Sequence, residues 1–241
     1  FTLRLYLDVF THSKIMPALL NTLLIASVAA LTATLLGTLG AIGVFYMKKR
    51  PKQVLESVNE IPVVNADVVI AISLALLFKI SVDSLTRIGL VVDDKNFLTL
   101  LIGHIVLSIS FVYLNVKPKL QQMDPNDYEA ALDLGARPSY ALIKVVLPAI
   151  VPGIISGFML AFTLSLDDFI ITSFLRDKSF DTLSTYVQGV IVKSTIPAEL
   201  RALTTYIFLI TSVIVIANGR KKKSKAMLRA SKRAMLRKGA R

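Results

Sequence analysis

The sequence lacks cysteine and tryptophan altogether, and only 18% of its 241 residues are charged. The absence of cysteine excludes disulfides, cysteine-ligated metals and thiol catalysis. A charged fraction this low, beside 54% apolar residues, excludes an ordinary soluble domain and a disordered chain. The sequence also has no GxxxxGK(S/T) phosphate loop and no nucleophile–base constellation, so we expect neither ATP hydrolysis nor other enzyme activity in this chain. A membrane protein without its own catalytic site is what remains.

The net charge of +12 is concentrated at the C-terminus. Residues 220–241 hold 11 Lys and Arg and no acidic residue, which leaves +1 for residues 1–219. We therefore divide the chain into a membrane domain, residues 1–219, and a basic tail, residues 220–241. Such a tail is typical of a topology anchor at anionic lipid, and nucleic-acid binding is the weaker alternative.

Five apolar stretches are long enough to cross a membrane as helices. A hydrocarbon core of ~30 Å needs about 20 helical residues at ~1.5 Å each. Lipid offers no partner to open backbone groups, and the ten-residue alternation of a membrane barrel is absent. The sequence therefore predicts an all-α, polytopic membrane helical bundle. The predicted spans lie near residues 16–47, 61–80, 97–116, 149–175 and 202–219.

The basic residues predict the orientation of these spans. If the tail is cytoplasmic, loops 48–60 and 117–148 lie on the same side, and 19 basic residues lie inside against 9 outside. Without the tail the count is 8 against 9, so the prediction depends on the tail and on the basic cluster after the first span. We expect a multi-pass protein with a cytoplasmic C-terminal tail.

Loop 117–148 predicts two short helices instead of a flexible connector. Asp124 is suited to cap the first helix and Pro125 to begin it, because proline at the first helical position loses no hydrogen bond. Gly135 ends this helix, since glycine adopts the left-handed conformation at little cost. Pro138 begins a second short helix, after which the chain restarts as a span.

Three aspartates, Asp67, Asp167 and Asp168, lie within the apolar stretches. A charge near the bilayer centre costs at least ~2.5 to 3.5 kcal/mol, so each is expected to face a cavity, a neighbouring subunit or a cation. Carboxylates in a conduit favour a cationic passenger, because they repel an anion. Neighbouring helical residues diverge by about 100°, so one of Asp167 and Asp168 should line the pathway and the other should bond to protein.

The depths of these acids are expected to differ. Asp167 and Asp168 follow about 28 Å of helix from the inner side and belong to the outer half. Asp67 lies nearer the inner end of its own helix, where a helix cap or an inter-helix hydrogen bond is as plausible as a transport role. His104 is expected to be a hydrogen-bonded packing residue, with a proton relay as the weaker alternative. Without a second histidine or a carboxylate in register, no metal site is expected.

Loop 117–148 also carries a family motif. Glu129-Ala130-Ala131, then Gly135, then Leu147-Pro148 resemble the cytoplasmic EAA loop of ABC-importer permeases, with Val145 where that family favours isoleucine. The resemblance implies a type I ABC-importer permease fold and a first short helix that docks, as a coupling helix, in a groove on an ATPase subunit. Acidic residues would face a basic partner, and small residues would allow close approach. The expected coupling residues are Asp124, Asp127, Glu129, Ala130, Ala131, Asp133, Gly135, Leu147 and Pro148.

Two further segments extend the resemblance. Residues 65–74 (NADVVIAISL) and 162–168 (FTLSLDD) resemble the PotC-type permeases of bacterial spermidine/putrescine importers. That family has six spans, so the resemblance implies a further helix upstream of Phe1. It also implies polyamine import across the bacterial cell (inner) membrane. The substrate-binding residues expected from it are Asp167, Asp168, Asp67 and Asn65.

The same resemblance implies partners. They are a second, homologous permease (PotB-type), two ATPase subunits (PotA-type) that bind ATP and Mg, and an external polyamine-binding protein (PotD-type), with no cofactor in this chain. Membrane lipid is an expected contact, and nucleic acid is not. ATPase closure would pull residues 124–135 and open the conduit outward, as alternating access requires. Two alternatives stay open: an ABC permease for another substrate, such as ferric iron or an anion, and a stand-alone secondary carrier or channel.

Overall fold

The computed structural model describes residues 14–87, 94–177, 179–192, 200–202, 204–206 and 209. The chain forms two compact units: the larger is residues 17–189, and the smaller joins residues 1–16 to residues 190–241. In the smaller unit the described residues from 200 onward are helical, and two threonine hydroxyls donate to the carbonyl of Arg201. The described part of the chain contains helices and no strand, which confirms the all-α prediction.

Four helices in the described residues are long and apolar enough to cross a membrane. They are α2 (Ile15–Phe45), α4 (Asp67–Arg87), α5 (Phe97–Gln122) and the continuous helix Pro138–Asp167. The predicted spans near 16–47 and 97–116 are confirmed, and the helix that begins at Phe97 continues to Gln122. The predicted span near 202–219 lies largely outside the described residues, and the basic tail lies wholly outside them.

Helix α2 buries small side chains and exposes large ones. The buried residues include Ala26, Ala29, Ala30 and Ala33, and the exposed ones include Leu31, Leu35 and Leu39. Small residues let membrane helices approach closely. A Cβ atom on Gly37 would lie 2.9 Å from the Cβ of Val112 in α5, whereas one on Gly40 or Gly43 would meet nothing within 4 Å. Only the first of these glycines therefore closes a helix contact.

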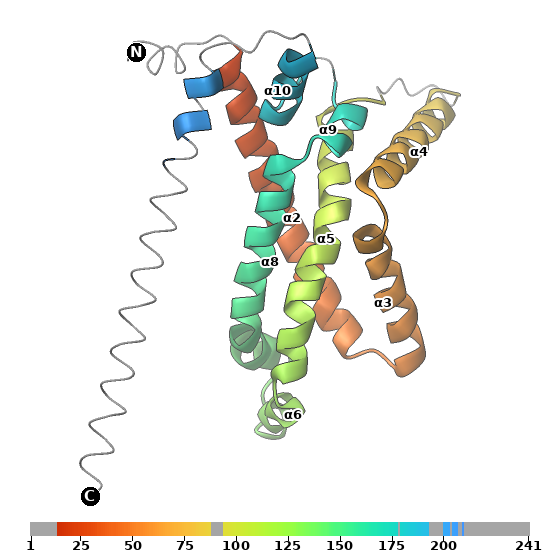
Figure 1. Ribbon diagram of the computed structural model, residues 1–241. Coiled ribbons are helices and arrows are strands. Elements are labelled where there is room, and N and C mark those ends of the chain that lie inside the picture. The colour runs from red at the N-terminus through yellow and green to blue at the C-terminus, as the bar shows by residue number, and fades with distance from the viewer. Residues whose placement is uncertain are drawn as a thin grey trace, which may run out of the picture. The chain divides into compact units, whose positions relative to one another are not determined.

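The predicted span near 61–80 is wrong in its bounds, because the helix breaks before Asp67. Helix α3 (Lys49–Val64) is a separate amphipathic helix with no buried residue, and α4 follows it. At Asn65 the backbone is extended (φ −76°, ψ 149°), so α3 cannot continue. The two helices follow one another along the bundle, so α4 begins partway along its length (Figure 1).

Helix α5 is the centre of the larger unit and packs along α8 (Leu147–Asp167). Asn96 starts α5 through reciprocal bonds with Thr99, a capping box. Glycines on α8 let the two helices touch: a Cβ atom on Gly153 would lie 2.8 Å from the carbonyl oxygen of Asn115. The buried core at this contact includes Val112, Val116, Leu120, Ile150 and Ala161.

The loop between α5 and α8 forms the predicted short helices. Helix α6 (Pro125–Asp133) begins where Asp124 Oδ1 accepts a hydrogen bond from the Asn126 N–H at 3.0 Å. Gly135 follows it with φ +86°, which is the predicted left-handed end. The second helix differs from the prediction, because α7 (Pro138–Ala141) runs through a π-helical turn, η1 (Leu142–Val146), directly into α8.

The predicted span near 149–175 is broken at Asp168. Helix α8 ends at Asp167, the backbone at Asp168 is extended (φ −65°, ψ 121°), and the short helix α9 (Ile170–Leu175) starts in a new direction. Helix α10 (Leu183–Val192) comes next. The N–H of its first residue donates to the Thr22 hydroxyl of α2 at 2.8 Å.

Candidate functional site

The three aspartates predicted from the sequence line one cavity of about 260 Å³. Asp67 comes from the start of α4, and Asp167 and Asp168 come from the end of α8. The rest of the lining is Leu107, Phe111, Thr163 and Leu164. Asp67 does lie at the end of its own helix, as expected. Because α3 carries the chain partway along the bundle before α4 begins, that end borders the same cavity as the other two aspartates (Figure 1).

Asp67 and Asp167 are exposed carboxylates. Within the described residues neither of them makes a hydrogen bond or an ion pair. Asp67 is the first residue of α4, where the helix dipole favours a negative charge. Asn65, the fourth residue expected at this site, ends α3 through its backbone N–H and is not part of the cavity lining.

Asp168 has a different environment, and its side chain is only 8% exposed. Its carboxylate accepts hydrogen bonds from the N–H of Ile171 at 3.2 Å, the N–H of Thr172 at 2.8 Å and the Thr172 hydroxyl at 2.8 Å. The carboxylate therefore satisfies the first turn of α9. Asp167 and Asp168 do face different surroundings, as predicted. The cause is different: α8 ends between them, so the rotation of about 100° per residue along a helix does not apply.

His104 in α5 lies next to Asp168 and is 2% exposed. Its Nδ1 atom is 2.7 Å from the Ser165 hydroxyl and its Nε2 atom 3.0 Å from the Thr172 hydroxyl. The prediction of a hydrogen-bonded packing residue is confirmed. The expectation that no carboxylate lies in register is wrong, since Asp168 Oδ2 is 3.5 Å from Nε2. Even so, in the described ranges no three His, Asp or Glu side chains gather as metal ligands.

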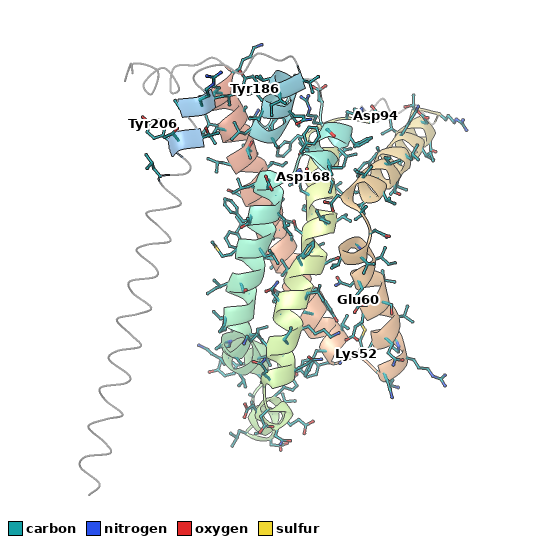
Figure 2. All side chains as sticks on the ribbon, viewed as in Figure 1. Lys52, Glu60, Asp94, Asp168, Tyr186 and Tyr206 are labelled. Atoms are coloured by element: carbon teal, nitrogen blue, oxygen red, sulfur yellow. The ribbon has the colours of Figure 1, made fainter. Side chains whose placement is uncertain are left out.

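A second charged cluster, between α3 and α5, was not predicted. Lys117 Nζ lies 3.1 Å from Glu56 Oε1 and 5.9 Å from the centre of the Tyr113 ring, and the Tyr113 hydroxyl donates to the same Glu56 oxygen at 3.5 Å. Glu60 lies one helical turn further along α3 (Figure 2). The available signal was the Glu56 and Glu60 spacing of four residues, which places both on one face of α3.

The expected coupling residues are largely exposed. Helix α6 presents Asp127, Glu129 and Asp133 to solvent, Gly135 is exposed, and Leu134 beside it is 89% exposed. Two backbone bonds close the helix end around this glycine, from Gly135 N–H to Leu132 and from Ala136 N–H to Ala131. Leu147 and Pro148 are also exposed and begin α8, not α6.

One aromatic contact ties α6 to the end of α2. The rings of Tyr128 in α6 and Tyr46 lie 5.2 Å apart, and Tyr46 meets Phe45 edge-on at 5.1 Å. Partial burial and the neighbouring Tyr128 raise the pKa of Tyr46 above its ordinary value. Tyr128 of α6 therefore packs against the residue that directly follows α2.

The sequence matches the protein family described as "Binding-protein-dependent transport system inner membrane component" over residues 33–219. It is 31% identical over 218 residues to the spermidine/putrescine transport system permease protein PotC of Escherichia coli K12, covering 90% of this chain and 78% of that protein. It is 33% identical over 205 residues to the putrescine transport system permease protein PotI of the same organism, covering 85% and 71%.

Among solved structures, the chain resembles one in the crystal structure of a bacterial ABC transporter involved in the import of the acidic polysaccharide alginate. The TM-score is 0.74 with 16% sequence identity, over 92% of this chain and 84% of the other. At this identity the likeness concerns the fold alone. It agrees with the predicted type I permease bundle.

Proposed function

Because this chain belongs to the family of binding-protein-dependent transport system inner membrane components, we propose that it is the permease subunit of an ATP-driven polyamine importer. The observation that carries the substrate class is the cavity shared by Asp67 of α4 and Asp167 of α8. The names of the relatives, which are spermidine/putrescine and putrescine permeases, support the same passenger.

The cavity has the chemistry of an ammonium site. Two exposed carboxylates from different helices lack protein partners within the described residues, and apolar side chains surround them. In a weakly screened space such a pair attracts a cation and repels an anion. The ammonium groups of putrescine or spermidine would supply the missing charges, while Leu107 and Phe111 would contact the methylene chain.

Coupling to ATP hydrolysis is assigned to helix α6 and Gly135. An exposed acidic helix of nine residues, ended by an exposed glycine, suits a groove with basic residues on an ATPase subunit. The ATPase subunits would bind ATP and Mg. A second permease would complete the passage, and an external binding protein would deliver the polyamine.

The direction of coupling follows from the orientation. With the basic tail in the cytoplasm, α6 lies on the cytoplasmic side and meets the ATPases there. Closure of the ATPases would pull α6, and the contact between Tyr128 and Tyr46 would pass that movement to α2. The acid cavity would then open to the outside, and ATP hydrolysis would return it to the inside.

The test is uptake of labelled spermidine by cells that lack other polyamine importers and express the complete importer. Uptake should depend on ATP hydrolysis by the partner subunits and should be competed by putrescine but not by ferric citrate or alginate fragments. Loss of competition by polyamines, or competition by ferric citrate, would contradict the polyamine assignment. Uptake into liposomes that hold this chain alone would instead establish a stand-alone carrier.

A further inference from the structure

Four polar side chains form a continuous, largely buried hydrogen-bonded chain that ends at Asp168, in the lining of the acid cavity. Ser165 of α8, His104 of α5 and Thr172 of α9 are 4%, 2% and 0% exposed, and Asp168 ends the chain. The links are 2.7 Å from Ser165 Oγ to His104 Nδ1, 3.0 Å from His104 Nε2 to Thr172 Oγ1, and 2.8 Å from Thr172 Oγ1 to Asp168 Oδ2. The chain joins three helices that are separate in the sequence.

The order of donors along this chain follows from the one hydroxyl proton of Thr172. An ionised carboxylate only accepts, so the Thr172 hydroxyl donates to Asp168. It therefore accepts from His104, which fixes a proton on Nε2. In the neutral ring Nδ1 then accepts from the Ser165 hydroxyl. Every hydrogen bond in the chain points toward the Asp168 carboxylate, so each one strengthens the next.

Groups of the protein itself therefore compensate the charge of the Asp168 carboxylate. It accepts two backbone N–H bonds and one hydroxyl bond, and its backbone carbonyl accepts from the Ser184 hydroxyl at 2.7 Å. A buried carboxylate with such partners needs no external cation. Asp167, one residue earlier, has no such partner in the described residues and stands exposed in the cavity.

We infer that His104 is a positioning residue for the polyamine site and that Asp168 does not contact the substrate. His104 holds Thr172, and through it Asp168, so that α8 stops at Asp167 and α9 starts in its new direction. This break fixes the place of the Asp167 carboxylate in the cavity that Asp67 also lines. The inference rests on the proposed function, since it says which of the three aspartates in that cavity contact the polyamine and which does not.

The experiment measures the concentration dependence of spermidine uptake by the complete importer, together with the amount of importer in the membrane. His104→Phe should raise KM at least tenfold, because Asp167 is no longer held in place. His104→Gln, which keeps a donor near the Nε2 position, should restore KM to within about threefold of wild type. A purely structural role would lower the amount of importer and leave KM unchanged, which would overturn the inference.

Two further comparisons keep the inference testable if His104→Phe does not assemble. Thr172→Val, which removes the central hydroxyl, should raise KM more than Ser165→Ala, and Ser173→Ala on the exposed side of α9 should leave it unchanged. Asp168→Asn should raise KM less than Asp167→Asn does. The reverse order would place Asp168 against the substrate and refute the inference. Failure of wild-type importer to transport spermidine would instead refute the proposed function itself.

Discussion

Asp67 at the first position of α4 and Asp167 at the last position of α8 line the same cavity, although they stand 100 positions apart in the sequence. Both sit at helix ends within an otherwise apolar bundle. Helix ends leave backbone groups without helical partners, and such breaks are tolerated in membrane proteins where they border a cavity. The break after α3 and the break after α8 thus produce the site together.

The first prediction concerns this pair. Asp67→Asn and Asp167→Asn should each raise KM for spermidine about tenfold, because the low local dielectric strengthens each lost charge contact. The double variant should show non-additive loss if both carboxylates hold one ammonium. The measurement is labelled spermidine uptake against concentration. Asp83→Asn, an exposed acid further along α4 that does not line the cavity, is the matched control and should behave as wild type.

Local chemistry of the sequence was enough to predict the α6 region. Asp124, Pro125 and Gly135 act over one or two turns, and the structure forms the cap, the helix and the left-handed end at those positions. Pro138 begins its helix as predicted, but the expected interruption before α8 does not occur. Instead, one π-helical turn connects α7 to α8, and the residue types in this segment do not distinguish such a turn from a helix break.

The helix breaks that shape the acid cavity, at Asn65 and at Asp168, were not predicted. Residues 162–175 read as one apolar helix. In the structure the first turn of α9 is held separately by bonds to the Asp168 carboxylate and by the contact of His104 in α5 with Thr172. The bonds that the Asp168 carboxylate accepts are local, from residues three and four positions later, whereas the contact of His104 with Thr172 is a tertiary feature. The sequence singled out these three aspartates because an acid in an apolar stretch stands out. That they line one cavity could be seen only in the packed bundle.

The second prediction concerns the end of α6, the proposed coupling helix. Gly135→Ala should weaken docking of α6, because a non-glycine residue in the left-handed region costs about 1 kcal/mol or more. Gly135→Asn should stay near wild type, since asparagine adopts this conformation more readily. The measurement is spermidine transported per ATP hydrolysed by the complete importer. Equal coupling in the alanine and asparagine variants would show that the backbone conformation at this position is irrelevant.

The third prediction concerns the contact between α5 and α8. Gly153→Ala should lower the thermal midpoint of the detergent-solubilised importer, because the new Cβ would lie 2.8 Å from a backbone oxygen, an overpacking cost of roughly 1 to 3 kcal/mol. Gly40→Ala is the control, since its Cβ would meet nothing within 4 Å. A larger midpoint loss for the control than for Gly153→Ala would contradict the packing assignment.

The fourth prediction concerns the link from α6 to α2. Tyr128→Ala removes the ring that packs 5.2 Å from Tyr46, so ATP hydrolysis should continue while spermidine uptake falls severalfold. Tyr128→Phe keeps the ring and should preserve uptake. The paired measurements are ATPase rate and uptake in the same membranes. A proportional fall of both rates in Tyr128→Ala would mean that the contact supports assembly and does not transmit movement.

The fifth prediction concerns the ion pair between α3 and α5. Lys117 and Glu56 are each about one quarter to one fifth exposed, so solvent screens their attraction, and we expect a coupling energy of about 0.2 to 1 kcal/mol. A double-mutant cycle with Glu56→Gln and Lys117→Met, read as thermal midpoints, measures it. The coupling should shrink as salt is raised.

Since Lys117 also lies over the Tyr113 ring, Tyr113→Leu should reduce the coupling between Glu56 and Lys117 without abolishing it. A coupling that is unchanged between low and high salt would show that packing, not charge, joins α3 to α5.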